Sequence, residues 1–201
     1  MKKPVTFIYF DIGGVLLSWR EGHIRAAKKY GVPHEAVSRI VDAHWAAACR
    51  GTLSNADYMA MFAKVFGLRD PLPDLTDFWT DHYTPILETH TLVHELKGSY
   101  RIGLLTNAEN GAMKHATKKG LLPVIPWASV VDSSQLGTIK PETKIYEIAE
   151  KAAGVPPEEI FFIDDVPEYV EIAKSRGWQG MVFDTKDVVG SIKMLRIILC
   201  G

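Results

Sequence analysis

Short apolar runs alternate with amphipathic stretches over much of the chain. Four of the runs are rich in β-branched or aromatic residues and are bounded by turn or helix-start residues, as is typical of strands buried in a parallel sheet. They cover residues 5–10, 102–105, 160–163 and 180–183, and a weaker fifth run covers residues 128–131. The pattern predicts the strands of an α/β domain.

Helical periodicity separates these runs. Three of the helical segments are followed by a glycine, which commonly ends a helix. They cover residues 110–119, 141–153 and 167–176, and a terminal amphipathic helix is expected at 187–199. Because strand and helix alternate, right-handed crossovers and a Rossmann-like, doubly wound parallel sheet are predicted.

The alternation fails between residues 18 and 89, where no convincing strand is found. Helical patterns cover residues 22–30, 34–49 and 54–66, with a weaker one at 74–83. Ser54 followed by Asp57 resembles a capping box at the start of the third pattern. We therefore expect an all-helical insertion at 18–89 within a core formed by residues 1–17 and 90–201.

Composition narrows the classes of partner. The 201 residues include 23 Lys and Arg against 24 Asp and Glu, so no net field attracts nucleic acid or an anionic membrane. No apolar run reaches the length of a membrane span. Only Cys49 and Cys200 are present, without disulfide or zinc spacing. These features favour a cytoplasmic monomer or homodimer that acts on a small molecule.

Polar residues follow three of the predicted strands. In open parallel sheets, ligands bind beyond the carboxyl ends of the strands. The first run leads into Asp11, the second into Thr106 and Asn107, and the run at 160–163 into the pair Asp164 and Asp165. We expect these side chains to meet at one edge of the sheet.

Each group has an ordinary explanation by itself, as a turn residue, a helix cap or a solvated lysine. Together they supply more. Lys140 precedes a helix that starts at Pro141 and can extend a positive charge into a cleft. Adjacent carboxylates beside a third are costly unless a cation neutralises them, and free N–H groups at a helix start suit phosphate. The set meets the requirements of phosphoryl transfer.

Four segments resemble, in order, the motifs of the haloacid dehalogenase superfamily. They are Phe-Asp-Ile-Gly-Gly-Val-Leu around Asp11, Leu-Leu-Thr-Asn ending at Asn107, Gly-Thr-Ile-Lys-Pro-Glu around Lys140, and Phe-Ile-Asp-Asp ending at Asp165. The helical insertion resembles the C1-type cap of that family, and motifs and cap together cover nearly the whole chain. The first motif is closest to a branch with Asp-x-Gly-Gly that includes sugar-phosphate phosphatases.

The resemblance implies a Mg²⁺-dependent phosphatase that cleaves a small phosphorylated metabolite, such as a sugar phosphate, through an aspartyl-phosphate intermediate. Asp11 would be the nucleophile and a metal ligand. The Gly13 carbonyl and Asp165 would be further metal ligands, with Asp164 in support. The transferring phosphoryl group would be held by Thr106, Asn107 and Lys140, with Thr106 and Lys140 also counted as catalytic.

Gly13 is a departure from the family pattern, because the phosphatases usually carry a second aspartate there as general acid and base. Such a group typically contributes ~10²- to 10⁴-fold. We therefore expect a preference for leaving groups that depart without much protonation, such as anomeric, aryl or acyl phosphates.

Two alternatives remain open. Dehalogenases of the family also lack the second aspartate, but they need no metal, so the pair Asp164 and Asp165 weighs against that activity. The other alternative is a catalytically weak protein that binds a phosphorylated ligand in a regulatory role. Metal-dependent hydrolysis of an activated phosphate ester, lost in Asp11→Asn, would separate an enzyme from a binding protein.

Several large residues of the insertion have two interpretations. Trp19, Trp45 and Trp79 could line a substrate pocket, but aromatic residues at helical spacing more often belong to a core. Arg20 and Arg50 could contact a substrate, although surface arginines are the commoner outcome.

Overall fold

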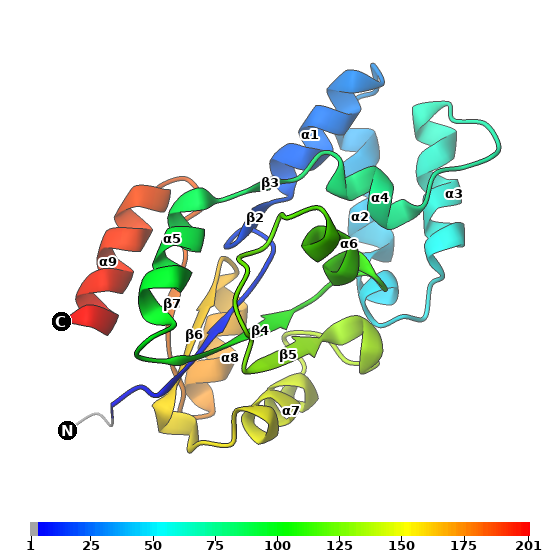
Figure 1. The fold of residues 1–201 in the computed structure, drawn as a ribbon. Helices are drawn as coiled ribbons and strands as arrows, with labels where there is room; N and C mark the ends of the chain where they lie inside the picture. The colour runs from blue at the N-terminus through cyan, green and yellow to red at the C-terminus, as the bar shows by residue number, and fades with distance from the viewer. Residues whose placement is uncertain (1–3) are drawn as a thin grey trace.

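A five-stranded parallel sheet forms the centre of the molecule (Figure 1). The computed structural model describes residues 4–201, so residues 1–3 of the predicted core segment lie outside the described part. The strand order is β5-β4-β1-β6-β7. The strands are β1 (Phe7–Phe10), β4 (Arg101–Thr106), β5 (Ser129–Asp132), β6 (Ile160–Asp164) and β7 (Gln179–Val182). All five predicted runs, including the weaker one, form this sheet.

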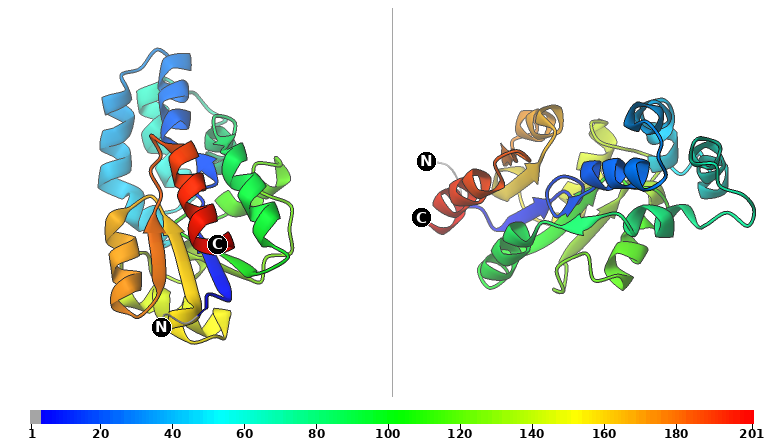
Figure 2. Two further views of the ribbon diagram at one scale, coloured as in Figure 1. Left: turned by 90° about the vertical axis from the view of Figure 1, so that its left-hand side faces the viewer. Right: turned by 90° about the horizontal axis from the view of Figure 1, so that it is seen from above.

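Helices cover both faces of the sheet (Figure 2). The alternation of side chains along β1 divides the core: Ile8 and Phe10 pack into one apolar cluster, and Phe7 and Tyr9 into the other. The first cluster is completed by α5 (Leu87–Leu96), α6 (Ala112–Lys118) and α9 (Val188–Cys200). The second is completed by α7 (Thr143–Ala153) and α8 (Pro167–Ser175). Two short 3₁₀ turns, η1 (Ser133–Gln135) and η2 (Pro157–Glu159), precede α7 and β6.

Between β1 and α5 the chain forms four helices that we call the helical insertion. They are α1 (Arg20–Lys29), α2 (His34–Cys49), α3 (Asn55–Phe66) and α4 (Leu75–Thr80). They pack around an apolar cluster of their own that includes Phe62, Phe66 and Trp79. The Ser54 hydroxyl accepts a hydrogen bond from the backbone N–H of Asp57, which confirms the predicted cap of α3.

A small ribbon joins the insertion to the sheet. Strands β2 (Leu17–Ser18) and β3 (Thr84–Pro85) pair in antiparallel fashion where the chain leaves the core and where it returns. The expectation of no strand between residues 18 and 89 is wrong at these two places. A two-residue strand has too few positions to show alternation, so the pattern could not reveal it.

No helix within residues 4–201 combines the length and the apolar character needed to cross a membrane.

Close packing in the middle of the sheet requires a glycine at position 103. A Cβ atom there would lie 2.8 Å from Cε1 of Tyr9, 2.9 Å from the carbonyl oxygen of Ser129 and 3.0 Å from Cε1 of Phe7. Tyr9 cannot withdraw freely, because its hydroxyl donates a hydrogen bond of 2.8 Å to the carbonyl of Ala149. Strand β4 therefore has no room for a larger residue at this point.

We predict that Gly103→Ala lowers the free energy of unfolding by roughly 1–3 kcal/mol, the usual cost of overpacking a core. Gly98→Ala is the control, because a Cβ atom at Gly98 meets nothing within 4 Å. Urea denaturation of both variants checks the prediction. Equal midpoints for the two variants would contradict the packing argument.

Candidate active site

The carboxyl ends of β1, β4 and β6 bring the predicted site residues together. The register pairs Phe10 of β1 with Leu104 of β4 and with Ile163 of β6. The residues that follow these three therefore lie level with one another across the sheet. This places Asp11 beside Asp164 at the edge of the sheet. Sequence neighbours carry Asp165 and Thr106 to the same edge. The expectation that separate segments meet at this edge is therefore met by the structure.

Three carboxylates form a tight group here. One oxygen from each of Asp11, Asp164 and Asp165 lies within 4.8 Å of the others. Lys140 enters the group from the loop before α7, with its Nζ 2.9 Å from Oδ1 of Asp11 and 2.5 Å from Oδ2 of Asp164. Three carboxylates thus face one contacting ammonium group, so negative charge is left in excess. A divalent cation is the chemical species that such an oxygen cluster accepts.

The three acidic side chains are not equivalent. Both oxygens of Asp164 are occupied, Oδ2 by Lys140 and Oδ1 by the backbone N–H of Val166 at 2.8 Å. Asp11 makes the ion pair with Lys140 without the alignment of a hydrogen bond, and its buried Oδ1 has no hydrogen-bond partner. No side chain of residues 4–201 donates a hydrogen bond to Asp165. Asp11 and Asp165 are therefore the open ligands, and Asp164 holds Lys140 in place.

The pKa values show how burial and like charge act on the cluster. Burial, together with the charge of Asp11, raises the pKa of Asp165 to about 6. Burial also raises the pKa of Asp164, against the opposing effect of Lys140. Burial alone would lower the pKa of Lys140, but the charges of Asp11 and Asp164 raise it above its usual range. The lysine therefore stays charged, and the carboxylates gain from a further cation.

Two glycines after Asp11 allow the backbone to approach the site. Gly14 has a φ of +81°, and a Cβ atom on it would lie 2.4 Å from Oδ2 of Asp165. At Gly13 a Cβ atom would lie 2.8 Å from Cδ1 of the Trp19 ring. The backbone of Gly13 also lines the cavity next to Asp11, where its carbonyl is the predicted metal ligand. The position at which the motif resemblance implies an aspartate side chain is thus bordered by an indole ring.

Thr106 ends β4, and Asn107 follows it at the same edge of the sheet. Thr106 is buried and lines the cavity above the carboxylates. Asn107 is engaged elsewhere: its Nδ2 donates to the carbonyl of Lys140 at 2.9 Å, and its Oδ1 accepts from the N–H of Lys140 at 2.8 Å. The side-chain amide therefore positions the lysine loop. That Asn107 also holds the phosphoryl group stays a prediction, since its second amide N–H and its backbone N–H are left for that role.

A cavity of about 430 Å³ lies above the carboxylates, within the range of small-molecule sites. Trp19 and Trp45 line it with nearly parallel rings, whose centroids are 6.3 Å apart at an interplanar angle of 11°. The interpretation of these two tryptophans as core residues is wrong, although it is right for Trp79, which is buried against Phe62. The helical period alone does not distinguish a core from a cavity wall.

The two arginines of the insertion have different surroundings. Arg50 at the end of α2 pairs with Glu142, with Nε 3.1 Å from Oε1. The other oxygen of Glu142 accepts a hydrogen bond of 2.7 Å from Thr138, in the loop that carries Lys140. Arg50 thus joins the insertion to that loop and is not a substrate contact. Arg20 lines the cavity and lies over the Trp19 ring, 5.2 Å from its centroid.

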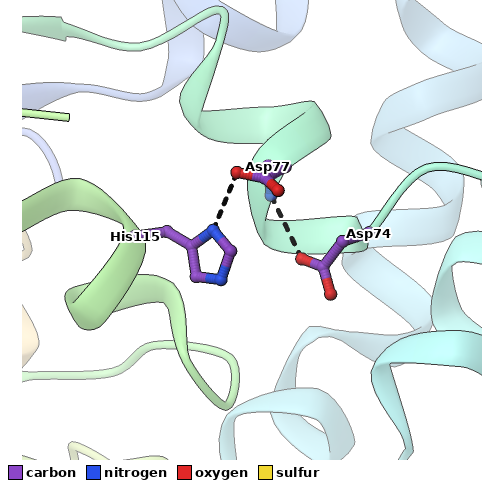
Figure 3. A group of neighbouring side chains, drawn as sticks. All are labelled: Asp74, Asp77 and His115. Atoms are coloured by element: carbon purple, nitrogen blue, oxygen red, sulfur yellow. Dashed lines mark hydrogen bonds and ion pairs between the residues drawn. The ribbon is translucent and has the colours of Figure 1, made fainter. Parts of the chain in front are cut away.

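A second group of possible metal ligands lies on the surface between α4 and α6 (Figure 3). Asp74 caps α4 through a hydrogen bond of 2.8 Å from the N–H of Thr76. Asp77 lies 2.8 Å from Nδ1 of His115 and also pairs with Lys119. These polar groups already satisfy one another, in contrast to the Asp11 cluster. We assign them the structural role of joining α4 to α6.

We predict that Gly14→Ala destabilises the protein more than Gly31→Ala. Both glycines have a positive φ, of +81° and +66°, so both variants bear the same kind of backbone strain. Only Gly14 also faces a carboxylate, because a Cβ atom on Gly31 meets nothing within 4 Å. Thermal melts with and without MgCl₂ check this. Matching melting temperatures and matching Mg²⁺ effects would show that Gly14 makes no contact of consequence with Asp165.

We predict that Lys140→Met lowers the free energy of unfolding by about 3–5 kcal/mol, since two buried carboxylates lose their partner. Mg²⁺ should restore part of the loss by replacing the missing positive charge. Lys119→Met is the matched control: Lys119 pairs with Asp81 near the surface, where such pairs contribute ~0–1 kcal/mol. Chemical denaturation measures both. A loss no larger than that of the control would refute the role given to Lys140.

Two relatives match nearly the full length of the chain. Phosphatase MT3486 of Mycobacterium tuberculosis is 26% identical over 221 residues, which cover 98% of this chain and 98% of that protein. The D-ribitol-5-phosphate phosphatase of Bacteroides thetaiotaomicron is 25% identical over 183 residues, which cover 86% of this chain and 88% of that protein. Both are named as phosphatases.

The fold and the family agree with the motifs. The HAD family enzyme bt-2542 of Bacteroides thetaiotaomicron, solved in complex with magnesium and inorganic phosphate, has a TM-score of 0.73 at 21% identity, covering 90% of this chain and 95% of that chain. The family model of haloacid dehalogenase-like hydrolases matches residues 6–177. The expected family is therefore confirmed, and the chain belongs to the haloacid dehalogenase-like hydrolase family.

Proposed function

We propose that this protein is a Mg²⁺-dependent phosphatase that hydrolyses a small phosphorylated metabolite through an aspartyl-phosphate on Asp11. The observation that carries the proposal is the group of three carboxylates and one buried lysine at the floor of a cavity. Membership of a hydrolase family and two relatives named as phosphatases support it. The site thus combines a nucleophile, open oxygen ligands and a fixed cation.

The residues fit a magnesium ion on their own chemistry. Asp11 and Asp165 have carboxylate oxygens without hydrogen-bond donors, and negative charge in the cluster exceeds the positive charge of Lys140. These two carboxylates and the Gly13 carbonyl would hold the ion, with Asp164 adjacent. When bound, the ion would offset the charge that a phosphate ester brings to the carboxylates.

The chain's own groups position the reaction. Lys140 pairs with Oδ1 of Asp11 and so orients the carboxylate, which leaves its second oxygen to attack phosphorus. Asp164 and the carbonyl of Leu105, 3.1 Å from Nζ, fix the lysine. Thr106 at the end of β4 would donate a hydrogen bond to a phosphoryl oxygen. Since these groups are buried and held in place, they stabilise charge without reorganising during the reaction.

The cavity suggests the class of substrate. The rings of Trp19 and Trp45 offer flat apolar walls, and Arg20 adds a positive charge at the side of the insertion. Such walls suit the carbon chain of a phosphorylated sugar or polyol, and one relative is named for D-ribitol 5-phosphate. We further propose that residues 18–89 act as a cap over a core of residues 1–17 and 90–201, and that the enzyme works in the cytoplasm.

The two alternative functions are less well supported. A dehalogenase needs no metal, and excess negative charge would oppose a carboxylate-bearing substrate such as a haloacid. A protein that merely binds a phosphorylated ligand does not need a carboxylate oxygen left open at the floor of the cavity. The geometry therefore favours an enzyme that acts on phosphate esters.

We predict phosphate release from a panel of phosphorylated metabolites and from 4-nitrophenyl phosphate in the presence of MgCl₂, and its loss with EDTA. Asp11→Asn should lower kcat by at least ~10³-fold, since it removes the nucleophile while keeping the shape of the side chain. A colorimetric phosphate assay and a thermal melt of the variant measure both. Phosphatase activity that survives in Asp11→Asn would overturn the proposal. Chloride release from 2-chloropropionate by a wild-type protein that releases no phosphate would overturn it too.

A further inference from the structure

The cavity contains a further buried acid that the motifs do not include. Glu109 follows Thr106 by three positions, in the loop between β4 and α6. Its residue is 6% exposed, and it lines the same cavity as Asp11 and Asp165. Asp42 also lines the cavity but is exposed to solvent. Among residues 4–201, Glu109 is therefore the one buried carboxyl group of the cavity that lies outside the proposed metal cluster.

The carboxyl group of Glu109 has no side-chain partner in the described part of the chain, and the one hydrogen bond that stabilises its charge comes from its own backbone N–H. No side chain of residues 4–201 forms a hydrogen bond or an ion pair with it. The titratable groups that feel its charge are Cys49 of α2, Tyr58 of α3 and Tyr83 before β3, and Asp132 of β5 acts on it in turn. None of these groups is a cation. A buried acid at the wall of a cavity, with no cation or side-chain donor bound to it, is available to a ligand.

Glu109 lines the cavity from the loop after β4, and its charge acts on Cys49, Tyr58 and Tyr83 of residues 18–89. In phosphoryl transfer the attacking and leaving oxygens lie roughly in line, so the leaving group points away from Asp11. The cavity extends from Asp11 to Trp45 and Tyr83 of residues 18–89, which leaves room for a leaving group on that side. Glu109 acts on groups of that segment and extends from the strand that ends at Thr106. It therefore lines the cavity beside residues 18–89, the side on which we place the leaving group.

The same side lacks the usual acid. Gly13 has no side chain, and the Trp19 ring occupies the space that a Cβ atom would need. We propose that Glu109 is the acid–base residue of this enzyme and exchanges a proton with the leaving-group oxygen and with the attacking water. This proposal rests on the phosphatase activity proposed above. It takes the part that an aspartate at position 13 plays in related phosphatases.

The proton transfers balance over the two steps. As an oxygen of Asp11 bonds to phosphorus, the ester P–O bond breaks and the proton of Glu109 passes to the departing oxygen, which leaves as an alcohol. Glu109, now a carboxylate, takes a proton from water as the water oxygen attacks phosphorus. The bond between phosphorus and Asp11 then breaks, which releases inorganic phosphate and restores both side chains.

The electrostatics of Glu109 agree with this exchange. Burial, with a contribution from Asp132, raises the pKa of Glu109 to about 7. Near neutral pH the residue is thus present both as an acid and as a base, which favours proton transfer in both directions. Gly13 alone leads us to expect that only esters with activated leaving groups are hydrolysed. With Glu109 as the acid, alkyl phosphates become substrates as well.

Glu109→Gln tests the proposal on three esters of similar shape: 4-nitrophenyl, phenyl and benzyl phosphate. Glutamine keeps the size of the side chain but carries no exchangeable acid. We expect kcat/KM for benzyl phosphate, the poorest leaving group, to fall by ~10²- to 10⁴-fold, and that for 4-nitrophenyl phosphate by less than about 10-fold. A loss that grows from ester to ester is a signature that a merely structural residue would not give.

The pH profile gives a second readout. Since the protonated form of Glu109 is the active acid, kcat/KM of the wild type for benzyl phosphate should fall as the pH rises through about 7. This basic limb should be absent in Glu109→Gln. Thermal melts establish that the variant is folded.

Asp42→Asn is the control, because it removes the exposed carboxyl group of the cavity and should keep the wild-type ratio among the three esters. The Glu109 proposal is overturned by an equal loss on all three esters, by wild-type ratios in Glu109→Gln, or by wild-type inactivity on benzyl phosphate. It is also overturned if Asp42→Asn shows the graded loss. In each of these cases Mg²⁺-dependent, Asp11-dependent hydrolysis of 4-nitrophenyl phosphate would leave the phosphatase activity standing, whereas its absence would remove that activity itself.

Discussion

An excess of buried negative charge is the constraint on which the rest of the site depends. Asp11, Asp164 and Asp165 lie together because three parallel strands end at one level, and only Lys140 among residues 4–201 makes an ion pair with them. Such a cluster is stable only when its charges are distributed among partners. Here Asp164 accepts hydrogen bonds from Lys140 and from the backbone N–H of Val166. The carboxylates of Asp11 and Asp165 remain open to a cation.

The support for this cluster extends well beyond the strand ends. Asn107 holds the backbone of Lys140 through two hydrogen bonds, and Glu142 holds the preceding loop through Thr138. Arg50 of the insertion binds the same glutamate. The lysine is therefore positioned by both the sheet and the helical insertion. Asp77 and His115 give α4 and α6 a separate contact, which joins the insertion to the core at a further place.

Features that depend on neighbouring residues in the sequence could be predicted. The strands and most helices were predictable because the hydrophobic period and the residues that end an element lie within each segment. The predicted strand ends then located Asp11, Thr106 and Asp165. The engagement of the Asn107 amide depends on a loop 33 positions away, which no local pattern records. The wall formed by Trp19 and Trp45 and the burial of Glu109 depend on how the insertion packs against the sheet. Such features follow from tertiary contacts and carry no periodic signal.

The contact between Trp19 and Gly13 has a consequence for how this enzyme can change. An aspartate placed at position 13 would drive its Cβ atom to within 2.8 Å of the indole ring, which lies in the wall of the cavity. A change to a two-aspartate arrangement by a single substitution at position 13 would therefore disturb that wall. A protein engineer has to exchange positions 13 and 19 together, with a smaller residue at 19 making room for the carboxylate at 13.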